Sequence, residues 1–89
     1  MYYVYMLKCA DESLYTGWTV DPQKRLKAHN DGTASKYTRA RLPVEMIYLR
    51  ELSTKREAMS LEWHIKALPR RKKDLLLQGR DPYTLFKKD

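Results

Sequence analysis

Arg25 and His29 have side chains suited to the chemistry of a phosphodiester. At this spacing on a helix, they would project from the same face, one turn apart. Arginine presents a rigid fork of donors to phosphate oxygens, and histidine accepts or releases a proton near neutral pH. Lys24 and Lys27 stand beside them, so the alternative is a solvated basic face. The spacing therefore indicates either a phosphate site or a charged helix surface.

Glu62 is a carboxylate at the edge of an apolar stripe. At about 100° per residue, a helix that begins near Thr54 places Glu62 beside its aligned apolar residues, which are Ala58, Leu61, Ile65 and Leu68. A carboxylate rarely accepts burial without a partner, and a metal ion or an arginine would supply one. The alternatives are that Glu62 turns to water or pairs with Lys66.

The balance of charge favours a polyanionic partner. The chain has 89 residues, with 18 Lys and Arg against 11 Asp and Glu, and its net charge is +7. This length predicts one domain, residues 1–89, with one modest core. A basic domain of this kind suits nucleic acid, although many basic domains are merely soluble.

Several classes of site and location are not expected. Cys9 is the single cysteine, which excludes an internal disulfide and a multi-cysteine zinc site. The sequence has no glycine-rich phosphate loop and no serine-histidine-acid arrangement, so we expect no small-molecule organic cofactor. Met1 leads straight into tyrosines, and no apolar run is long enough to span a bilayer. We therefore expect a cytoplasmic protein without membrane contact.

The order of predicted elements is strand, strand, helix, strand, helix, helix. Asp21-Pro22 and Thr54 are typical helix starts, and Asn30-Asp31-Gly32 and Gly79 are typical stops. The predicted strands are 2–9, 14–20 and 44–52, and the predicted helices are 22–30, 54–68 and 70–78. Residues 33–42 read as a basic loop, and the tail is expected to pack on the core through Pro82, Tyr83, Leu85 and Phe86. This order predicts an α+β fold.

The register of the first hairpin decides whether Tyr5 and Tyr15 face each other. A three-residue connection, 11–13, would place Leu7 opposite Gly17 and both tyrosines on one face, whereas a two-residue connection would separate them. The preference of strands for tyrosine is an alternative explanation for both residues. In the third strand, alternation predicts Met46, Tyr48 and Arg50 on one side, and Ile47 and Leu49 on the other.

Several short motifs, taken in order, resemble the GIY-YIG nuclease superfamily. They are Tyr3-Val4-Tyr5, Tyr15-Thr16-Gly17, Arg25 with His29, and Glu62 in a later helix. The chain is most similar to the small, bacterial, single-domain branch of uncharacterised function. Recurring sequence motifs of that branch match Lys36–Arg39 (KYTR) and residues 62–68 (EWHIKAL). The resemblance covers residues 2–75 and implies a three-stranded antiparallel sheet flanked by helices.

The resemblance also implies roles for these residues. Glu62 would bind one divalent cation, Mg²⁺ or Mn²⁺, and Tyr5 would orient and deprotonate the attacking water, with help because a phenol is a weak base at neutral pH. Tyr15 would line the same site, and Arg25 would stabilise charge on the phosphate. His29 would relay a proton or hold a phosphate, and Gly17 would serve as a structural turn.

The implied function is metal-dependent endonuclease cleavage of DNA, in repair or recombination. Trp18 would stack on a base. The other expected nucleic-acid contacts are Lys36, Tyr37, Arg39, Arg41, Arg70, Arg71, Lys72 and Lys73. Two alternatives stay open: a module that binds nucleic acid without cutting, and a nuclease subunit that needs a targeting protein.

Overall fold

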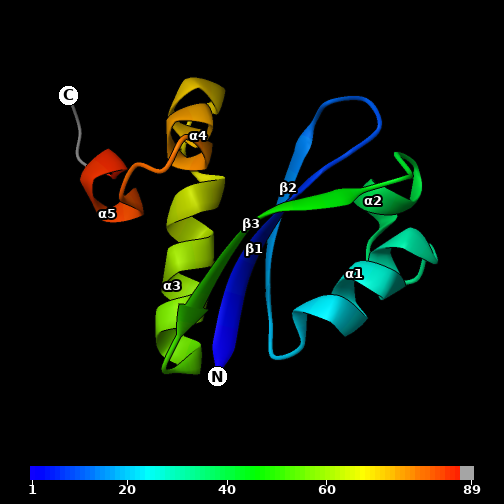
Figure 1. Cartoon of the computed structure of the whole chain (residues 1–89), viewed down its shortest axis with the longest axis horizontal. Coiled ribbons are helices and arrows are strands. Elements are labelled where there is room, and N and C mark those ends of the chain that lie inside the picture. The colour runs from blue at the N-terminus through cyan, green and yellow to red at the C-terminus, as the bar shows by residue number, and fades with distance from the viewer. Residues whose placement is uncertain (87–89) are drawn as a thin grey trace.

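The chain folds as a three-stranded antiparallel sheet with helices on both sides. The computed structural model describes residues 1–86, and residues 87–89 of the predicted domain lie outside them. The strand order is β2-β1-β3 (Figure 1). The elements are β1 (Tyr2–Lys8), β2 (Leu14–Thr19), α1 (Pro22–Asn30), α2 (Lys36–Arg39), β3 (Glu45–Leu52), α3 (Lys55–Lys66), α4 (Arg70–Leu77) and α5 (Pro82–Leu85). The predicted α+β fold is therefore confirmed, with two single-turn helices, α2 and α5, added.

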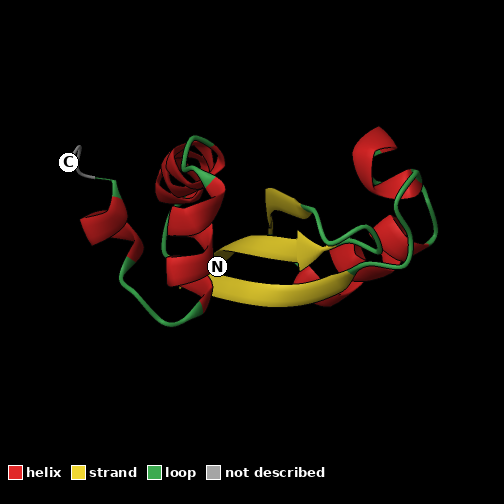
Figure 2. Cartoon of the chain, turned by 90° about the horizontal axis from the view of Figure 1, so that it is seen from above, coloured by secondary structure: helices red, strands yellow, loops and turns green. Residues whose placement is uncertain are grey.

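Two apolar clusters cover the two faces of the sheet, because successive side chains of a strand point to opposite faces. Val4 and Met6 of β1 pack with the apolar stripe of α3 in the larger cluster. Tyr5 and Leu7 belong to the smaller cluster, which partly buried Leu26 of α1 joins. Figure 2 shows the strands between the helices α3–α5 and the helices α1–α2. The odd-numbered face of β1 is thus the one that α1 covers.

The first hairpin has a three-residue connection, one position earlier than predicted. The Cys9 amide donates to the Ser13 carbonyl at 2.9 Å, so residues 10–12 form the connection. Glu12 has φ +71°, as the last residue of such a connection requires. Tyr5 consequently lies opposite Gly17, and Leu7 lies opposite Tyr15. Each residue of β1 therefore pairs two residues earlier in β2 than predicted. The placement of Tyr5 and Tyr15 on one face is confirmed.

An irregularity in β3 overturns the simple alternation predicted for this strand. Met6 pairs with Tyr48 and Leu7 pairs with Met46, so the register shifts between them. A bulge inserts one residue and moves the following side chains to the other face. Met46 therefore packs in the smaller cluster and Tyr48 against the larger one, on opposite faces of the sheet. The prediction that both lie on one side is wrong for this reason.

The predicted helix starts are confirmed. Asp21 accepts a hydrogen bond from the Lys24 amide at 3.1 Å at the start of α1. Thr54 caps α3 by accepting from the Glu57 amide at 3.1 Å, and its hydroxyl donates to the Glu57 carboxylate at 3.0 Å. These contacts fix where α1 and α3 begin, and hence where His29 and Glu62 lie.

The basic loop and the tail contain more structure than predicted. Ser35 caps α2 by accepting from the Tyr37 amide at 3.1 Å. In the tail, Pro82 and Leu85 are buried, as predicted, but Tyr83 is 48% exposed and does not pack in the core. Within residues 1–86, no helix is both long and apolar enough to cross a membrane.

Candidate active site

Gly17 makes room for the ring of Tyr5. Tyr5 is buried, and its ring crosses β2 at the position of Gly17. A Cβ atom at residue 17 would lie 2.6 Å from the Tyr5 hydroxyl oxygen and 2.7 Å from its Cζ. Gly17 lies within β2, so its predicted role as a turn is wrong. The glycine is required by close approach of the tyrosine ring.

A hydrogen-bonded chain starts at the hydroxyl of Tyr5. Its oxygen lies 2.8 Å from Nε2 of buried His29, and Nδ1 of His29 lies 2.9 Å from the hydroxyl oxygen of Thr38. The Thr38 hydroxyl donates to the Ser35 carbonyl at 3.3 Å, so its oxygen is left to accept from Nδ1–H. This assigns the tautomer: Nε2 carries the lone pair, and the Tyr5 hydroxyl donates to it.

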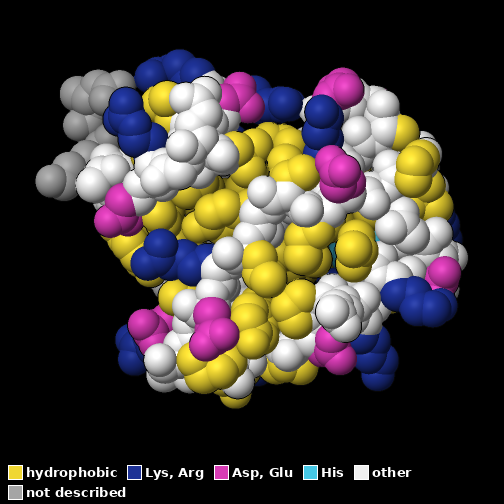
Figure 3. Space-filling model, viewed as in Figure 1, with side chains coloured by type: hydrophobic (Ala, Val, Ile, Leu, Met, Phe, Trp, Pro, Cys, Tyr) yellow, Lys and Arg dark blue, Asp and Glu magenta, His cyan; other side chains and the backbone are white. Residues whose placement is uncertain are grey.

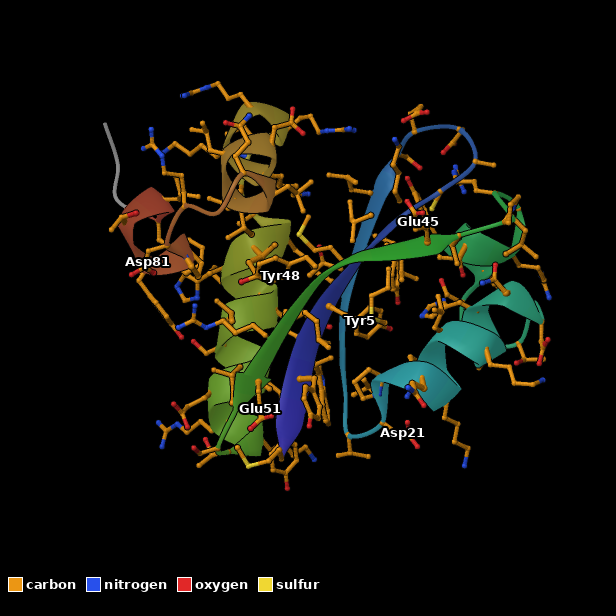
Figure 4. All side chains as sticks on the ribbon, viewed as in Figure 1. Tyr5, Asp21, Glu45, Tyr48, Glu51 and Asp81 are labelled. Atoms are coloured by element: carbon orange, nitrogen blue, oxygen red, sulfur yellow. The ribbon has the colours of Figure 1, made fainter. Side chains whose placement is uncertain are left out.

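Tyr15 completes an aromatic cluster with Tyr5 and His29. Its ring centroid lies 6.4 Å from that of Tyr5 and 5.1 Å from that of His29. Tyr37 stacks on Tyr15 from α2 at 6.1 Å. Figure 4 shows Tyr5 between the sheet and α1. The structure therefore brings Tyr5, Tyr15 and His29 together, as expected.

The environment holds Tyr5 and His29 neutral at pH 7. Burial raises the pKa of the Tyr5 phenol far above its ordinary value of 10.0. The charges of Tyr15 and Glu62 raise this pKa further, whereas Arg25 lowers it. Burial and the positive charge of Arg25 lower the pKa of His29 from its ordinary value of 6.5. At neutral pH, His29 is therefore an acceptor for a proton from Tyr5.

Arg25 lies at the solvent-exposed margin of this cluster. It is exposed on α1 and lines a pocket of about 250 Å³ with Thr19 and Lys24. Its charge acts on both Tyr5 and His29. Of the predicted pair, Arg25 is thus accessible to a phosphate, and His29 is buried behind Tyr5.

Glu62 lies on α3 and acts electrostatically on Tyr5. Its side chain is 20% exposed, and its carboxylate lies 3.6 Å from Nζ of Lys66. The negative charge of Glu62 raises the pKa of Tyr5, although less than burial and Tyr15 do. Pairing with Lys66, one of the alternatives from the sequence, is therefore present.

Glu62 is the residue that fits a hard cation. Among residues 1–86, no three acidic, histidine or cysteine side chains gather into a metal cluster. A single carboxylate suffices for Mg²⁺, which commonly retains several waters and takes phosphate oxygens as further ligands. The partly exposed carboxylate of Glu62 fits this mode of binding.

Comparison with known sequences decides the family. A sequence profile described as the GIY-YIG catalytic domain matches residues 1–74. The chain belongs to the GIY-YIG family. The resemblance seen in the motifs is therefore confirmed, and membership of the GIY-YIG family indicates a nuclease.

Small proteins named UPF0213 are similar to this GIY-YIG chain over most of their length. A UPF0213 protein of Clostridium perfringens is 54% identical over 80 residues, which cover 90% of this chain and 86% of that protein. UPF0213 protein YazA of Bacillus subtilis is 49% identical over 79 residues, covering 89% and 80%. The NMR structure of UPF0213 protein BH0048 from Bacillus halodurans has a TM-score of 0.60 at 44% identity, covering 93% and 90%. The fold is thus shared with a solved structure.

The GIY-YIG site does not include Trp18. Trp18 points to the opposite face of β2, where its ring lies 6.2 Å from the ring of Tyr2 and 5.6 Å from Nζ of Lys55. Residues of β2 alternate between faces, so Trp18 lies opposite to Tyr15 and Gly17. The expectation of base stacking by Trp18 gains no support from this position.

Arg41 and Arg70 are both occupied within the protein. Nε of Arg41 lies 3.0 Å from the Asp11 carboxylate, and its guanidinium carbon lies 3.8 Å from the ring centroid of Tyr37. Arg70 pairs with Asp74 at 3.1 Å and donates to the Glu12 carbonyl at 3.1 Å. These arginines are therefore structural contacts as well as predicted nucleic-acid contacts.

The remaining basic residues lie on different surfaces. Lys36 and Arg39 are exposed on α2, and Arg71 is exposed on α4. Lys72 donates to the Leu85 carbonyl at 3.2 Å, and Lys73 lines a pocket beside Tyr15. On the face seen in Figure 3, hydrophobic side chains spread over the middle and most Lys and Arg lie toward the margin. The cluster 70–73 is thus divided among several contacts.

Thr38 is a residue of the site that the sequence did not reveal. It is buried, and its hydroxyl fixes the tautomer of His29. The segment Lys36–Arg39 drew attention through its charges and its family resemblance, whereas a single threonine in a predicted loop carried no signal. Its inclusion in that recurring segment was the available hint.

Proposed function

We propose that this GIY-YIG domain is a divalent-metal-dependent endonuclease that hydrolyses phosphodiester bonds in DNA. The observation that carries the proposal is the 2.8 Å contact from the Tyr5 hydroxyl to Nε2 of His29, with Nδ1 engaged by Thr38. A base must lie within hydrogen-bond reach of the proton that it receives, and this contact satisfies that requirement.

In this mechanism, Tyr5 and His29 act as a concerted proton relay in which two protons move together. The oxygen of the attacking water forms a bond to phosphorus and passes a proton to the Tyr5 oxygen. The phenol proton moves at the same time to Nε2 of His29, and the bond from phosphorus to the departing oxygen breaks. The raised pKa of Tyr5 makes a free phenolate rare at pH 7. The relay avoids that species because Tyr5 remains neutral throughout.

Arg25 and Glu62 contribute charge at the two margins of the site. The exposed guanidinium of Arg25 is suited to bind the phosphate and to stabilise negative charge that develops on it. Glu62 would hold the Mg²⁺ or Mn²⁺ ion, which when bound supplies positive charge for the phosphate and the departing oxygen. Lys66 lies 3.6 Å from one carboxylate oxygen of Glu62, so a cation held by Glu62 would compete with this ion pair.

The test is cleavage of labelled single-stranded, duplex and branched DNA with Mg²⁺, with Mn²⁺ and with EDTA. We expect metal-dependent cleavage by the wild type and a loss of at least about 10²-fold in Glu62→Gln. Glu57→Gln is the matched control, because it removes one charge from the same helix and glutamine keeps an oxygen that can accept from the Thr54 hydroxyl. DNA binding without cleavage by the wild type on every substrate would reject the proposal in favour of a binding module or a partner-dependent subunit.

A further inference from the structure

A second pocket adjoins the proposed site on the side away from Arg25. It has a volume of about 230 Å³ and is lined by Leu14, Tyr15, Thr16, Tyr37, Lys66 and Lys73. These residues come from β2, α2, α3 and α4. Two ammonium groups thus meet an apolar and aromatic wall in one hollow.

The lining indicates the chemical class of the ligand. Within residues 1–86, the ammonium of Lys73 pairs with no carboxylate, and burial and the charge of Arg70 lower its pKa. An anion at this position would offset both effects. Leu14 and the mutually stacked rings of Tyr15 and Tyr37 supply an apolar wall against which a base can pack. A phosphate joined to a base, which is one nucleotide, satisfies both halves of the pocket.

The size of the pocket sets one nucleotide as the upper limit for the ligand. Sites for small molecules usually have volumes of roughly 300 to 1,000 Å³, so this pocket is smaller than most. A base that remains paired and stacked in a duplex is not free to enter it. Removing a base from a stack costs a few kcal/mol, and least where the base is already unpaired.

Two of the lining residues connect the pocket to the proposed catalytic cluster. Tyr15 lies in ring contact with Tyr5 and His29. Lys66 is the ion-pair partner of Glu62 at 3.6 Å. We propose that this pocket binds one unstacked nucleotide next to the scissile phosphate, so that the domain selects DNA with an unpaired nucleotide at the cut. This inference rests on the proposed nuclease function.

The experiment compares two DNA duplexes that differ by one unpaired 2-aminopurine nucleotide. Binding is measured in EDTA, which removes cleavage from the readout, with wild type, Lys73→Gln, Lys73→Arg and Lys27→Gln. Lys27→Gln is the matched control, because Lys27 is an exposed lysine of α1 whose partner is Asp31. The fluorescence of 2-aminopurine reports the environment of the unpaired base.

We expect the wild type to bind the unpaired substrate at least about tenfold more tightly than the paired one, equivalent to ~1.4 kcal/mol. Lys73→Gln should bring this ratio close to one, Lys73→Arg should retain most of it, and Lys27→Gln should leave the ratio unchanged. A wild-type ratio near one, or a ratio that Lys73→Gln does not alter, would overturn the inference.

Cleavage with Mn²⁺ separates this inference from the proposed function. If both duplexes are cut at equal rates and Glu62→Gln abolishes both, the pocket inference fails and the nuclease function stands. If the unpaired substrate is preferred in binding but neither is cut, the nuclease function fails and the nucleotide pocket stands.

Discussion

Tyr5 is held in place by its backbone, its ring and its hydroxyl. Its backbone lies in the central strand β1, its ring crosses Gly17, and its hydroxyl donates to His29. A reactive group on a regular strand is positioned more narrowly than one on a loop. The geometry of this residue therefore depends on Gly17 and His29 as much as on its own position.

Gly17→Ala tests this close approach. The new Cβ would lie 2.6 Å from the Tyr5 hydroxyl, so the ring must move. We expect a loss of about 1 to 3 kcal/mol in the free energy of unfolding, as for other overpacked interiors, and a slower cleavage rate. Urea denaturation and single-turnover cleavage measure the two effects. An alanine variant with unchanged stability and rate would show that the ring does not need this space.

The pH dependence of stability and of cleavage should reflect the protonation of His29. Its pKa is lowered in the folded state, so the unfolded chain binds a proton at higher pH than the folded chain does. The free energy of unfolding should therefore decrease as the pH falls below about 6.5, through the window down to the lowered pKa. The cleavage rate reports the folded protein, so it should fall only as the pH approaches the lowered pKa of His29, because protonated Nε2 cannot accept from Tyr5.

Denaturation and cleavage between pH 4.5 and 8 measure these two profiles, with His29→Gln as the comparison. Glutamine does not titrate, so the variant should be slow at every pH and lose the stability change near pH 6.5. A wild-type rate that rises as the pH falls below 6.5 would contradict the relay.

The sequence identified which residues could do chemistry at the site, but it did not identify their contacts in three dimensions. The spacing of Arg25 and His29 indicated a shared helix face, but α1 presents His29 to the sheet and leaves Arg25 exposed. The helical period alone does not show which residues of one helix face are buried against the sheet. The carboxylate of Glu62 was recognised from the apolar stripe, whereas its choice between Lys66 and a cation depends on three-dimensional distances.

At the scale of elements, α2 connects the hairpin loop to the aromatic cluster. Arg41 bonds Asp11 of the loop, covers the ring of Tyr37 and donates to the Tyr37 carbonyl at 2.8 Å. Tyr37 in turn stacks on Tyr15. This arrangement makes Arg41 a positioning residue for Tyr15.

Arg41→Gln and Asp11→Asn distinguish positioning from DNA contact. We expect each variant to lower the cleavage rate by roughly tenfold, below the 10²-fold that a 1 Å misplacement can cost. The two effects should add only in part in the double variant, because both variants break the contact of Arg41 with Asp11. Stability should change by no more than about 1 kcal/mol, since the pair is partly exposed.

DNA affinity of the same two variants tests whether Arg41 contacts DNA directly. If Arg41 instead binds a phosphate directly, Asp11→Asn would free its charge and strengthen DNA binding, while Arg41→Gln would weaken it. Opposite changes in affinity, measured by fluorescence anisotropy, would therefore contradict the positioning role.

Most elements could be predicted from local sequence, and two local features could not. Caps, stops and alternation located the strands and the long helices. The β3 bulge depends on pairing with β1, so the sequence of β3 alone gave no sign that Met46 and Tyr48 separate. Helix α2 is one turn long and depends on Ser35 and on burial of Thr38, which a charged segment does not indicate.

At the scale of the whole molecule, the two pockets suggest a path for the DNA. The Arg25 pocket includes Thr19 at the end of β2, and the Lys73 pocket includes Leu14 near its start. Gly17 and the ring of Tyr5 lie between them. The net charge of +7 favours association with a polyanion, and the two pockets place Lys24, Arg25, Lys66 and Lys73 at the two ends of this path. Charge alone could not predict this arrangement, because several arginines are engaged by other parts of the protein.

The central claim is that the Tyr5 hydroxyl passes a proton from the attacking water to His29. The direct measurement is the single-turnover cleavage rate of Tyr5→Phe with saturating protein. This substitution removes the hydroxyl oxygen and retains the ring. Tyr48→Phe is the matched control, since Tyr48 lies on the other face of the sheet (Figure 4). The account predicts a loss of about 10²- to 10⁴-fold for Tyr5→Phe, with DNA affinity retained and Tyr48→Phe within about twofold of wild type. A Tyr5→Phe variant that cuts at the wild-type rate would contradict it.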